Sequence, residues 1–346
     1  MYFIFSALIL ILILLLILLL RNHLGKTSLR EALMNDTSVD SKKRLIESDS
    51  YKAPPGYAVD AVEVVPGLEL RSAVWQLDKS KGTILIFTGF TEFIEKYYET
   101  IGDLLARQWN VVIFDWRGQG LSSKLLKHKD KGYIENFNQF LQDADTIYTQ
   151  KVTPMQEPHN LLGHSMGGHL ALRTLQEHPD RYHRAVLSAP MQSIAGLPTG
   201  VMSKVAAFFR LIGLGQSYVI GGKDGDSNKT YERLTSDVSR FKKWSSIFQK
   251  EPRLLMGSAT WAWSNAAAKS MSFSMKRKQI QKIKTPVYLA SPKVDVVVDE
   301  LTHERLDDIN PLIKVVSYPE AKHEIYTESN VHRIRFIEEV DRFYSS

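Results

Sequence analysis

The feature that most constrains the fold is a regular alternation of short apolar runs and helix-like segments from residue 60 onward. Strands separated by helices of about ten or more residues indicate a mostly parallel sheet with helices on both faces. In such sheets the chemistry takes place at the carboxyl ends of the strands. The predicted strands are 68–77, 83–87, 111–115, 160–163, 185–188, 287–290 and 313–318, and the predicted helices between them include 93–108, 134–150 and 166–178.

One interval breaks this alternation. Between Pro190 and Pro286 the sequence holds no convincing strand, and helical stretches such as 201–212 take its place. We expect an insertion that forms a helical cap over residues 192–275, between two parts of an α/β core at 58–191 and 276–346. Its aromatic residues suit an apolar acyl chain, although most of them are expected simply to pack the cap on the core. They are Phe208, Phe209, Tyr218, Trp244, Phe248, Trp261 and Trp263.

The N-terminus is different in kind, because residues 2–20 carry no charge and are almost all Ile, Leu, Phe or Ala. A helix of about 20 such residues crosses a hydrocarbon core of ~30 Å. This predicts a transmembrane anchor over residues 1–20 and a linker over 21–57. A cleaved signal peptide is disfavoured, since no basic residue precedes the apolar run. Arg21, Lys26 and Arg30 follow the run, so the main domain is expected on the cytoplasmic side, at the inner membrane in a bacterium.

Composition excludes several classes of function. A hydrophobic content of 44% supports a real core, and the absence of cysteine excludes disulfides, thiolate metal sites and a cysteine nucleophile. The net charge of +6 comes with no basic stripe that would indicate nucleic acid. Residues 224–228 resemble the start of a calcium loop, but Lys229 and Thr235 stand where glycine and glutamate are required. We therefore expect no metal and no cofactor, and the oligomeric state is left open.

A serine lies between two glycines where a predicted strand meets a predicted helix, in Gly163-His164-Ser165-Met166-Gly167. In a nucleophile elbow, a tight strand-to-helix turn exposes the serine hydroxyl, and the glycines let neighbouring backbones approach. The pattern favours Ser165 as a nucleophile. A bare five-residue match is equally compatible with a glycine-rich turn that has no catalytic role.

A serine nucleophile needs a general base and a carboxylate that orients the base, and in this type of fold the order is Ser, Asp or Glu, His. Asp295 lies in the loop after strand 287–290 and is the candidate carboxylate. Asp299 is the alternative, although its position is typical of a helix start. Of the ten histidines, His323 alone follows a late strand and precedes the last helix, which makes it the candidate base.

The oxyanion of acyl transfer needs two backbone N–H donors. One is expected from Met166, directly after the nucleophile, and the other from the loop Thr88 to Glu92, where we assign it to Phe90. The segment from Asp115 to Gly120 also follows a strand. We interpret it as a turn with a structural ion pair rather than as part of the catalytic machinery.

Several motifs of the chain occur together in one known family. They are Gly89-x-x-Glu92 with Lys96-Tyr97, Asp115-x-Arg117-Gly118-Gln119-Gly120-x-Ser122, Gly163-His164-Ser165-Met166-Gly167-Gly168, Ala189-Pro190-Met191 and Lys322-His323-Glu324. From about residue 58 onward, the chain resembles the monoacylglycerol lipase and lysophospholipase L2 branch of the α/β hydrolases, of the serine aminopeptidase S33 type. Thr88 replaces a histidine usual in the monoacylglycerol lipases, which favours the lysophospholipase side. Val296 replaces a common arginine after the acidic residue.

We therefore expect an α/β-hydrolase fold and a serine hydrolase that cleaves the acyl ester of a lysophospholipid or monoacylglycerol through an acyl-enzyme. Ser165, Asp295 and His323 would form the triad. A peptidase or an acyltransferase with the same triad is the alternative, because the elbow determines acyl transfer but not the leaving group. The non-enzyme alternative is a membrane-bound scaffold. The expected partners are the lipid substrate and a membrane, and no nucleic acid.

Overall fold

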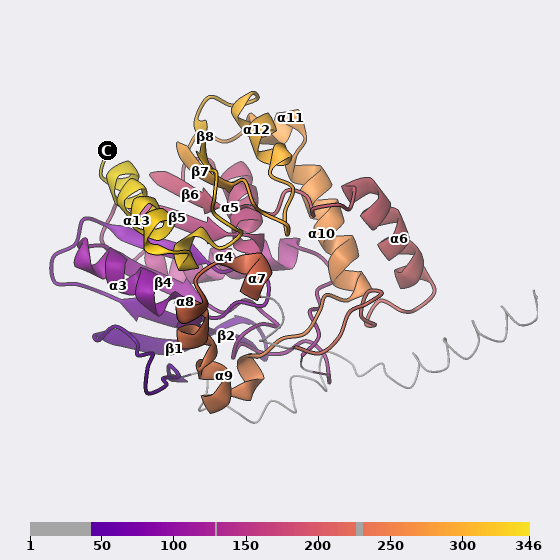
Figure 1. The fold of residues 1–346 in the computed structure, drawn as a ribbon, viewed down its shortest axis with the longest axis horizontal. Helices are drawn as coiled ribbons and strands as arrows, with labels where there is room; N and C mark the ends of the chain where they lie inside the picture. Colours follow the sequence, from indigo (N-terminus) through magenta and orange to yellow (C-terminus); the bar gives the residue numbers. More distant parts are fainter. Residues whose placement is uncertain (1–42, 129, 226–230) are drawn as a thin grey trace, which may run out of the picture.

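The computed structural model describes residues 43–128, 130–225 and 231–346, and its centre is an eight-stranded sheet (Figure 1). The strand order is β1-β2-β4-β3-β5-β6-β7-β8. The β1–β2 and β2–β4 pairs are antiparallel, and every pair from β4 to β8 is parallel. The strands are β1 (Tyr57–Val65), β2 (Leu68–Trp75), β3 (Thr83–Phe87), β4 (Asn110–Phe114), β5 (His159–His164), β6 (Arg184–Ser188), β7 (Val287–Pro292) and β8 (Ile313–Tyr318).

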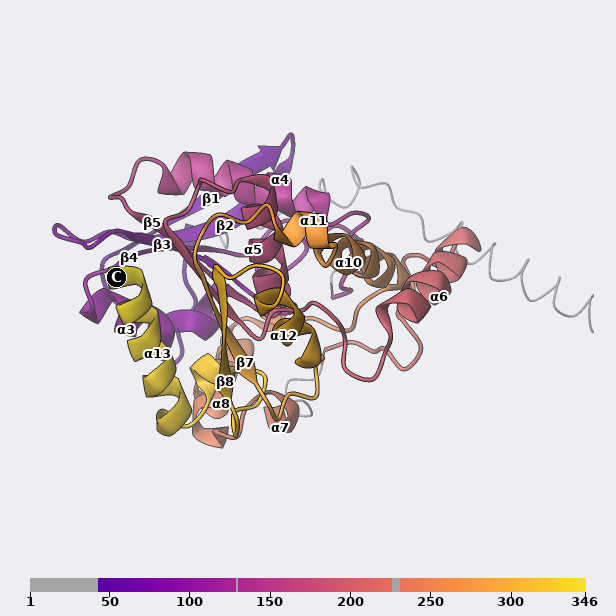
Figure 2. The same cartoon turned by 90° about the horizontal axis from the view of Figure 1, so that it is seen from above.

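Helices cover both faces of this sheet (Figure 2). The helices packed on the sheet or beside it are α3 (Tyr98–Ala106), α4 (Asn138–Ile147), α5 (Met166–Glu177), α12 (Leu301–Asp307) and α13 (Asn330–Ser345). Between β6 and β7 lie α6 (Thr199–Leu211), α7 (Tyr231–Leu234), α8 (Val238–Ser245), α9 (Ile247–Lys250), α10 (Trp261–Ser274) and α11 (Arg277–Ile280). Shorter helical turns are η2 (Ile94–Tyr97), η3 (Tyr148–Val152), η4 (Pro252–Leu254) and η5 (Ile325–Thr327).

The central strands separate two hydrophobic cores. In β3, Ile84 and Ile86 pack with residues of α3 and α13, whereas Leu85 and Phe87 pack with residues of α4 and α5. Because successive side chains of a strand point to opposite faces, a central strand such as β3 that is buried on both faces is apolar in consecutive positions. This is why the central strands are visible in the sequence as unbroken apolar runs. The predicted α/β-hydrolase core with a mostly parallel sheet is confirmed.

One strand was absent from the prediction. β1 is an edge strand that pairs only with β2, and Val62 is its only buried residue. The strand therefore lacks the apolar run that identifies the central strands. Its main-chain pairing with β2, rather than the burial of its side chains, is what makes it part of the sheet.

The parallel register brings the carboxyl ends of the central strands to one edge of the sheet. Phe87 at the end of β3 pairs with Gly163 of β5, and Pro292 at the end of β7 pairs with Tyr318 at the end of β8. The loops that leave these ends contain every residue that the sequence predicts for the site.

The described chain between β6 and β7 is helical, with no regular strand in the parts that the structure covers. Helix α6 packs along α10, while α8 packs against η2 on the other side of the site. We propose that the cap spans residues 192–275 and that the two parts of the core span 58–191 and 276–346, as the sequence predicts. The described end of the predicted linker packs on the core, where Leu45 and Ile46 are buried.

The prediction of a transmembrane helix is corrected. Among the described residues, no helix is long and apolar enough to cross a membrane. A bilayer core of ~30 Å needs about 20 apolar residues in one helix, and α13, the longest described helix, has 16 residues with many charges. The predicted single-pass membrane protein with a domain facing the cytoplasm is therefore not retained. The segment 1–20, on which that prediction was based, lies outside the described residues.

Helix α5 begins directly after Ser165 and crosses unusually close to two strands. A Cβ atom on Gly167 would lie 2.1 Å from the carbonyl oxygen of Phe87 in β3. A Cβ atom on Gly163 would lie 2.7 Å from the carbonyl oxygen of Gly167. Only glycine fits at either position, so the two glycines of the elbow set the distance between α5 and the sheet.

We predict that Gly167→Ala lowers the free energy of unfolding by about 3 kcal/mol or more, because the added methyl group overlaps backbone that cannot move without separating α5 from β3. Urea denaturation measures the loss. Gly200→Ala in α6 is the matched control, since no atom lies within 4 Å of its Cβ position. There the stability should be unchanged or raised by up to about 1 kcal/mol. Equal effects of the two changes would contradict the packing argument.

Candidate active site

Ser165 occupies the turn between β5 and α5 in a backbone conformation that is rare for a residue with a side chain. Its φ is 52° and its ψ is −116°. Hydrogen bonds hold this turn, from the Ser165 N–H to the carbonyl of Ser188 at 3.0 Å and from the Met191 N–H to the carbonyl of Ser165 at 2.9 Å. Such a conformation persists only where the surroundings enforce it, and it is typical of functional sites.

The structure brings the three residues predicted as a triad together in one chain of hydrogen bonds. His323 Nε2 lies 2.9 Å from Ser165 Oγ, and His323 Nδ1 lies 2.6 Å from Asp295 Oδ2. His323 follows β8 and Asp295 follows β7, so two neighbouring strand ends supply them. The side chain of Asp295 is fully buried and that of His323 is 4% exposed.

Asp295 is held as a carboxylate. Its Oδ1 accepts hydrogen bonds from the N–H groups of Val297 at 2.7 Å and Val298 at 3.1 Å, while Oδ2 faces His323. Burial alone would raise its pKa, but the hydrogen bond and charge of His323, together with the two N–H groups, outweigh burial and lower the pKa. An ionised carboxylate at this position orients the imidazole ring so that Nε2 faces the serine.

The alternative carboxylate, Asp299, lies elsewhere. Its Oδ1 accepts a hydrogen bond from the N–H of Leu301 at 3.2 Å, at the start of α12. Carboxylates are favoured there because the first N–H groups of a helix have no partner within it. The structure therefore places Asp299 at a helix start, as its sequence context indicates, and gives it no contact with His323.

In the loop after β3, the N–H of Phe90 has no hydrogen-bond acceptor among the described residues. The N–H of Gly89 donates to Glu92 Oε2 at 2.5 Å, and that of Thr91 donates to Gln119 Oε1 at 2.9 Å. Within the described part of the chain, no acceptor is found for the N–H of Phe90 or for that of Met166. These are the two donors that the sequence assigns to the oxyanion hole, and both lie beside the elbow.

A buried ion cluster that the sequence analysis did not assign to the site adjoins His323. Lys96 Nζ lies 2.8 Å from Glu92 Oε1 and 2.6 Å from Glu324 Oε1, and all three side chains are at most 5% exposed. The carboxylates outweigh burial and raise the pKa of Lys96, and Lys96 likewise lowers the pKa of Glu92. Glu92 also accepts hydrogen bonds from the hydroxyls of Tyr97 and Tyr326. In the sequence, the four-residue spacing of Glu92 and Lys96 is the feature that could have predicted this ion pair.

A second histidine ring lies against the base. The rings of His164 and His323 are 4.9 Å apart between centroids. Burial lowers the pKa of His164 to about 3, so this ring is neutral near pH 7 and adds no charge beside His323. His303, in contrast, is a buried residue of α12 whose ring contacts the hydroxyl of Ser291 and the carbonyl of Pro190.

A cavity of about 710 Å³ extends from Ser165 and His323 into the space beneath the cap. This is within the usual range of ligand pockets, about 300–1,000 Å³. Its walls are mostly apolar, and Trp244, Phe248, Trp261 and Trp263 are the aromatic cap residues that line it. The other three named in the sequence, Phe208, Phe209 and Tyr218, do not line it.

Among the residues that the structure describes, two groups have the donor atoms that a metal ion would need. Glu92, His164 and Glu324 form one, and His128, Asp130 and Asp224 form the other. Lys96 already lies between the two carboxylates of the first group and balances their charge. In the second group His128 and Asp224 are exposed and Asp130 is half-buried, and Tyr218 donates a hydrogen bond to Asp224.

The segment from Asp115 to Gly120 forms a turn with buried ion pairs, but the partners come from other elements. Asp115 pairs with Arg71 of β2 at 2.7 Å, and Arg117 pairs with Asp143 of α4 at 2.5 Å. The first pair holds the residue after β4 against β2, and Asp115 also accepts the N–H of Ile94, which follows the loop of Phe90.

The fold and the geometry of the site define an α/β hydrolase, with a serine at a strand-to-helix elbow and a histidine and an aspartate on later strand ends. Solved structures share the fold. A soluble variant of monoglyceride lipase from Saccharomyces cerevisiae has a TM-score of 0.67 at 16% identity, covering 86% of this chain and 99% of that one. Monoacylglycerol lipase from Paleococcus ferrophilus has a TM-score of 0.64 at 20% identity, covering 80% and 98%.

The chain belongs to the family described as serine aminopeptidase, S33, whose model matches residues 78–330. A probable lysophospholipase L2 of Haemophilus influenzae is 27% identical over 265 residues, which are 75% of this chain and 82% of the relative. Lysophospholipase L2 of Escherichia coli is 26% identical over 235 residues, 65% of this chain and 67% of the relative. The resemblance predicted from the motifs is confirmed, and the chain is a serine carboxylic-ester hydrolase.

We predict that Lys96→Met lowers the free energy of unfolding by about 3–5 kcal/mol, because it leaves two buried carboxylates without their cation. Denaturation in urea at neutral pH measures the change. Lys284→Met is the matched control, since Lys284 pairs with Asp180 while both side chains are more than 60% exposed. That change should stay within about 0.5 kcal/mol. A loss below about 1 kcal/mol in Lys96→Met would show that the cluster does not need its charge balance.

Proposed function

We propose that this chain hydrolyses the acyl ester of a lipid with a single acyl chain, a lysophospholipid or a monoacylglycerol, with Ser165, His323 and Asp295 as its catalytic triad. The observation that carries the proposal is that hydrogen bonds link these three side chains in a row at the end of an apolar cavity. In this arrangement the base is already within hydrogen-bond distance of the nucleophile, and the carboxylate already orients the base.

In the first half-reaction, Ser165 Oγ attacks the ester carbonyl carbon while His323 Nε2 takes the hydroxyl proton. The N–H groups of Met166 and Phe90, which have no acceptor among the described residues, bind the oxyanion of the tetrahedral intermediate. The carbon–oxygen bond to the leaving alcohol then breaks, and His323 returns the proton to that alcohol. Asp295 stabilises the charged imidazolium in between.

In the second half-reaction, His323 removes a proton from water as the water oxygen attacks the acyl-enzyme. A second tetrahedral intermediate forms in the same oxyanion hole. As it collapses, the bond from the acyl carbon to Ser165 Oγ breaks, His323 Nε2 returns its proton to Ser165 Oγ, and the fatty acid is released. The mechanism uses side chains and backbone amides of this chain alone.

The shape and lining of the cavity support a lipid substrate. Cap and core residues together give it an apolar wall, including Met202, Val205 and Leu255. An acyl chain placed there loses contact with water, which is favourable by roughly 0.8 kcal/mol for each buried methylene group. The names of the Haemophilus influenzae and Escherichia coli relatives point to the same substrate class, and Thr88 favours the lysophospholipid within it.

Labelling by a fluorophosphonate probe tests the nucleophile, because the probe reacts with a serine that a base activates. We predict that Ser165→Ala abolishes the labelling and that His323→Ala slows it by about 10³-fold or more. Ser188→Ala at the end of the neighbouring strand is the control and should still be labelled. Undiminished labelling of Ser165→Ala would exclude the nucleophile. Hydrolysis of a panel of lysophospholipids, monoacylglycerols, amides and diacyl lipids would then define the substrate.

The two candidate carboxylates can be separated directly. We predict that Asp295→Asn lowers kcat by about 10³- to 10⁴-fold, because an amide at this position favours the wrong tautomer of His323. Asp299→Asn, four residues along the chain, keeps an oxygen that can accept the N–H of Leu301 and should leave kcat within about twofold. Steady-state kinetics on a soluble ester measures both. The reverse order of effects would transfer the role to Asp299.

A further inference from the structure

The loop between β8 and α13 carries His323, and the peptide groups on both sides of this histidine are held from outside the loop's own backbone. The N–H of Lys322 donates to Glu328 Oε1 at 3.2 Å. The N–H of Glu324 donates to the carbonyl of Leu234, a cap residue, at 2.9 Å. The position of the His323 backbone therefore depends on one carboxylate and on the cap.

The carboxylate of Glu328 connects these two supports. Glu328 is fully buried, yet within the described chain it forms no ion pair. Instead it accepts hydrogen bonds from the N–H of Ser236 at 3.0 Å, from the hydroxyl of Ser236, and from the N–H of Lys322 and of Ser329, each at 3.2 Å. Hydrogen bonds to an ionised acceptor are stronger than neutral ones. One carboxylate thus joins the cap residue Ser236 to the residue before the catalytic histidine.

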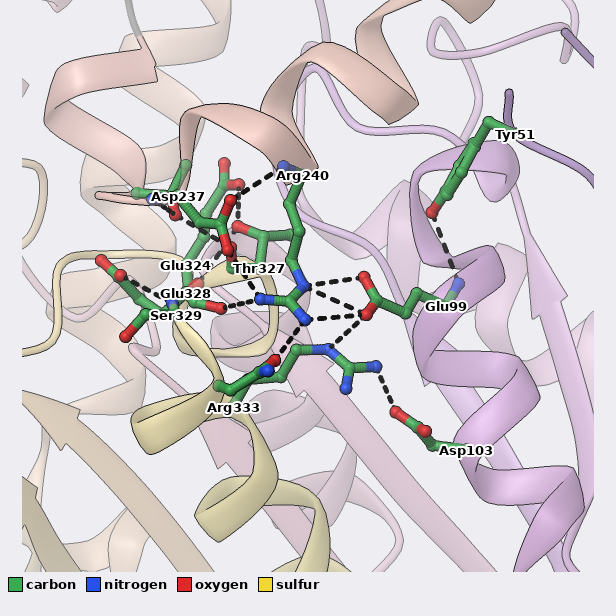
Figure 3. Close-up of polar contacts among 12 residues, drawn as sticks. Tyr51, Glu99, Asp103, Asp237, Arg240, Glu324, Thr327, Glu328, Ser329 and Arg333 are labelled. Atoms are coloured by element: carbon green, nitrogen blue, oxygen red, sulfur yellow. Dashed lines mark hydrogen bonds and ion pairs between the residues drawn. The ribbon is translucent and has the colours of Figure 1, made fainter. Parts of the chain in front are cut away.

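The cap segment that contains Ser236 is itself fixed to the core (Figure 3). Arg240 of α8 reaches Glu99 of α3 at 2.9 Å, the carbonyl of Glu328 at 2.8 Å and Asn330 Oδ1 at 2.6 Å. The buried hydroxyl of Thr235 donates to the carbonyl of Thr327 at 2.9 Å. In Figure 3, Arg240 lies between Glu99 on one side and Glu328 on the other. The segment 234–240 is consequently docked on α3, on α13 and on the histidine loop.

We propose that Ser236 and Glu328 are positioning residues for His323, so that the segment 234–240 of the cap sets the geometry of the base as well as covering the cavity. The inference rests on the role proposed above for His323. The imidazole ring must satisfy Asp295 at 2.6 Å and Ser165 at 2.9 Å at the same time. A displacement of about 1 Å in such an arrangement costs about 10²-fold in rate.

This assignment separates two functions that a cap can have. If the cap only binds the acyl chain, changes in it alter KM for long-chain substrates and leave both kcat and KM for a short soluble ester unchanged. A cap that positions the base affects kcat for every ester, whatever the length of its acyl chain. The kinetic constants for p-nitrophenyl butyrate, whose short chain gains little from the apolar cavity, therefore distinguish the two.

The experiment compares Ser236→Ala and Glu328→Gln with the unchanged chain on p-nitrophenyl butyrate. Loss of the Ser236 hydroxyl should lower kcat by about tenfold, and Glu328→Gln by about 10²-fold, with KM within twofold in both. The double variant should be no slower than Glu328→Gln alone, because Ser236 acts through Glu328. The rate of fluorophosphonate labelling should fall by the same factors as kcat.

Matched variants exclude a general loss of structure. Ser236→Thr keeps a hydroxyl and should restore kcat to within about threefold. Ser246→Ala removes another hydrogen bond made by the cap, that of Ser246 Oγ to Ser48 Oγ of the linker at 2.6 Å, and should leave kcat within twofold. Thermal unfolding of each variant establishes that it is folded at the assay temperature. Because Ser236 is exposed, Ser236→Ala opens no cavity and serves if Glu328→Gln does not fold.

The outcomes separate this proposal from the one on which it rests. If kcat of folded Ser236→Ala stays within twofold, or if Ser246→Ala loses as much as Ser236→Ala, the positioning role is wrong while the triad stands. If His323→Ala keeps near-full activity and labelling, the triad itself fails, and the positioning role fails with it. A rise of KM with unchanged kcat would reduce the segment to a substrate-binding surface.

Discussion

The site depends above all on how closely α5 can approach the sheet. Ser165 adopts a φ of 52° because the chain must turn from β5 into α5 within one residue. That turn is tight only because Gly163 and Gly167 carry no side chain where the backbone of β3 and α5 come together. The same approach leaves the N–H of Met166 beside the serine hydroxyl. The position of the proposed nucleophile and that of one proposed oxyanion donor are thus two consequences of a single packing constraint.

His323, the proposed base, is positioned by polar contacts rather than by a helix or a strand. His323 lies in a loop between two anchored neighbours. Glu324 pairs with Lys96 in the buried ion cluster and donates its N–H to the carbonyl of Leu234 in the cap, and Lys322 donates its N–H to Glu328. Buried charges are costly unless every one of them has partners, so such a cluster is stable in one arrangement only. A loop bounded in this way can hold a histidine as firmly as a helix does. The arrangement therefore requires several residues that are distant in the sequence to be present and correctly placed at the same time.

The central strands and the elbow could be predicted because their signals are local. An unbroken apolar run of five residues, such as 83–87, has few interpretations other than a buried strand, and a serine between two glycines at a strand end is a specific pattern. The edge strand β1 has one buried residue and gave no such signal. The apolar segment 1–20 produced a prediction of a membrane span that no described helix supports. Hydropathy alone therefore identifies the buried central strands, but it misses an exposed edge strand such as β1.

By itself, the amino-acid sequence determined the order of strands and helices, the elbow and the candidate residues Ser165, Asp295 and His323, since each follows from residues close together in the chain. The tertiary structure decided which residues meet. It placed Asp295, and not Asp299, against His323, and it paired Asp115 with Arg71 of β2 rather than with the nearby Arg117. It also placed Glu92, Lys96, Glu324 and Glu328 around the loop of His323. The physical reason is that hydrogen bonds and ion pairs act over a few ångströms, whereas these partners are separated by up to 228 positions in the chain (Lys96 and Glu324). Only the packed sheet and cap bring them within that range.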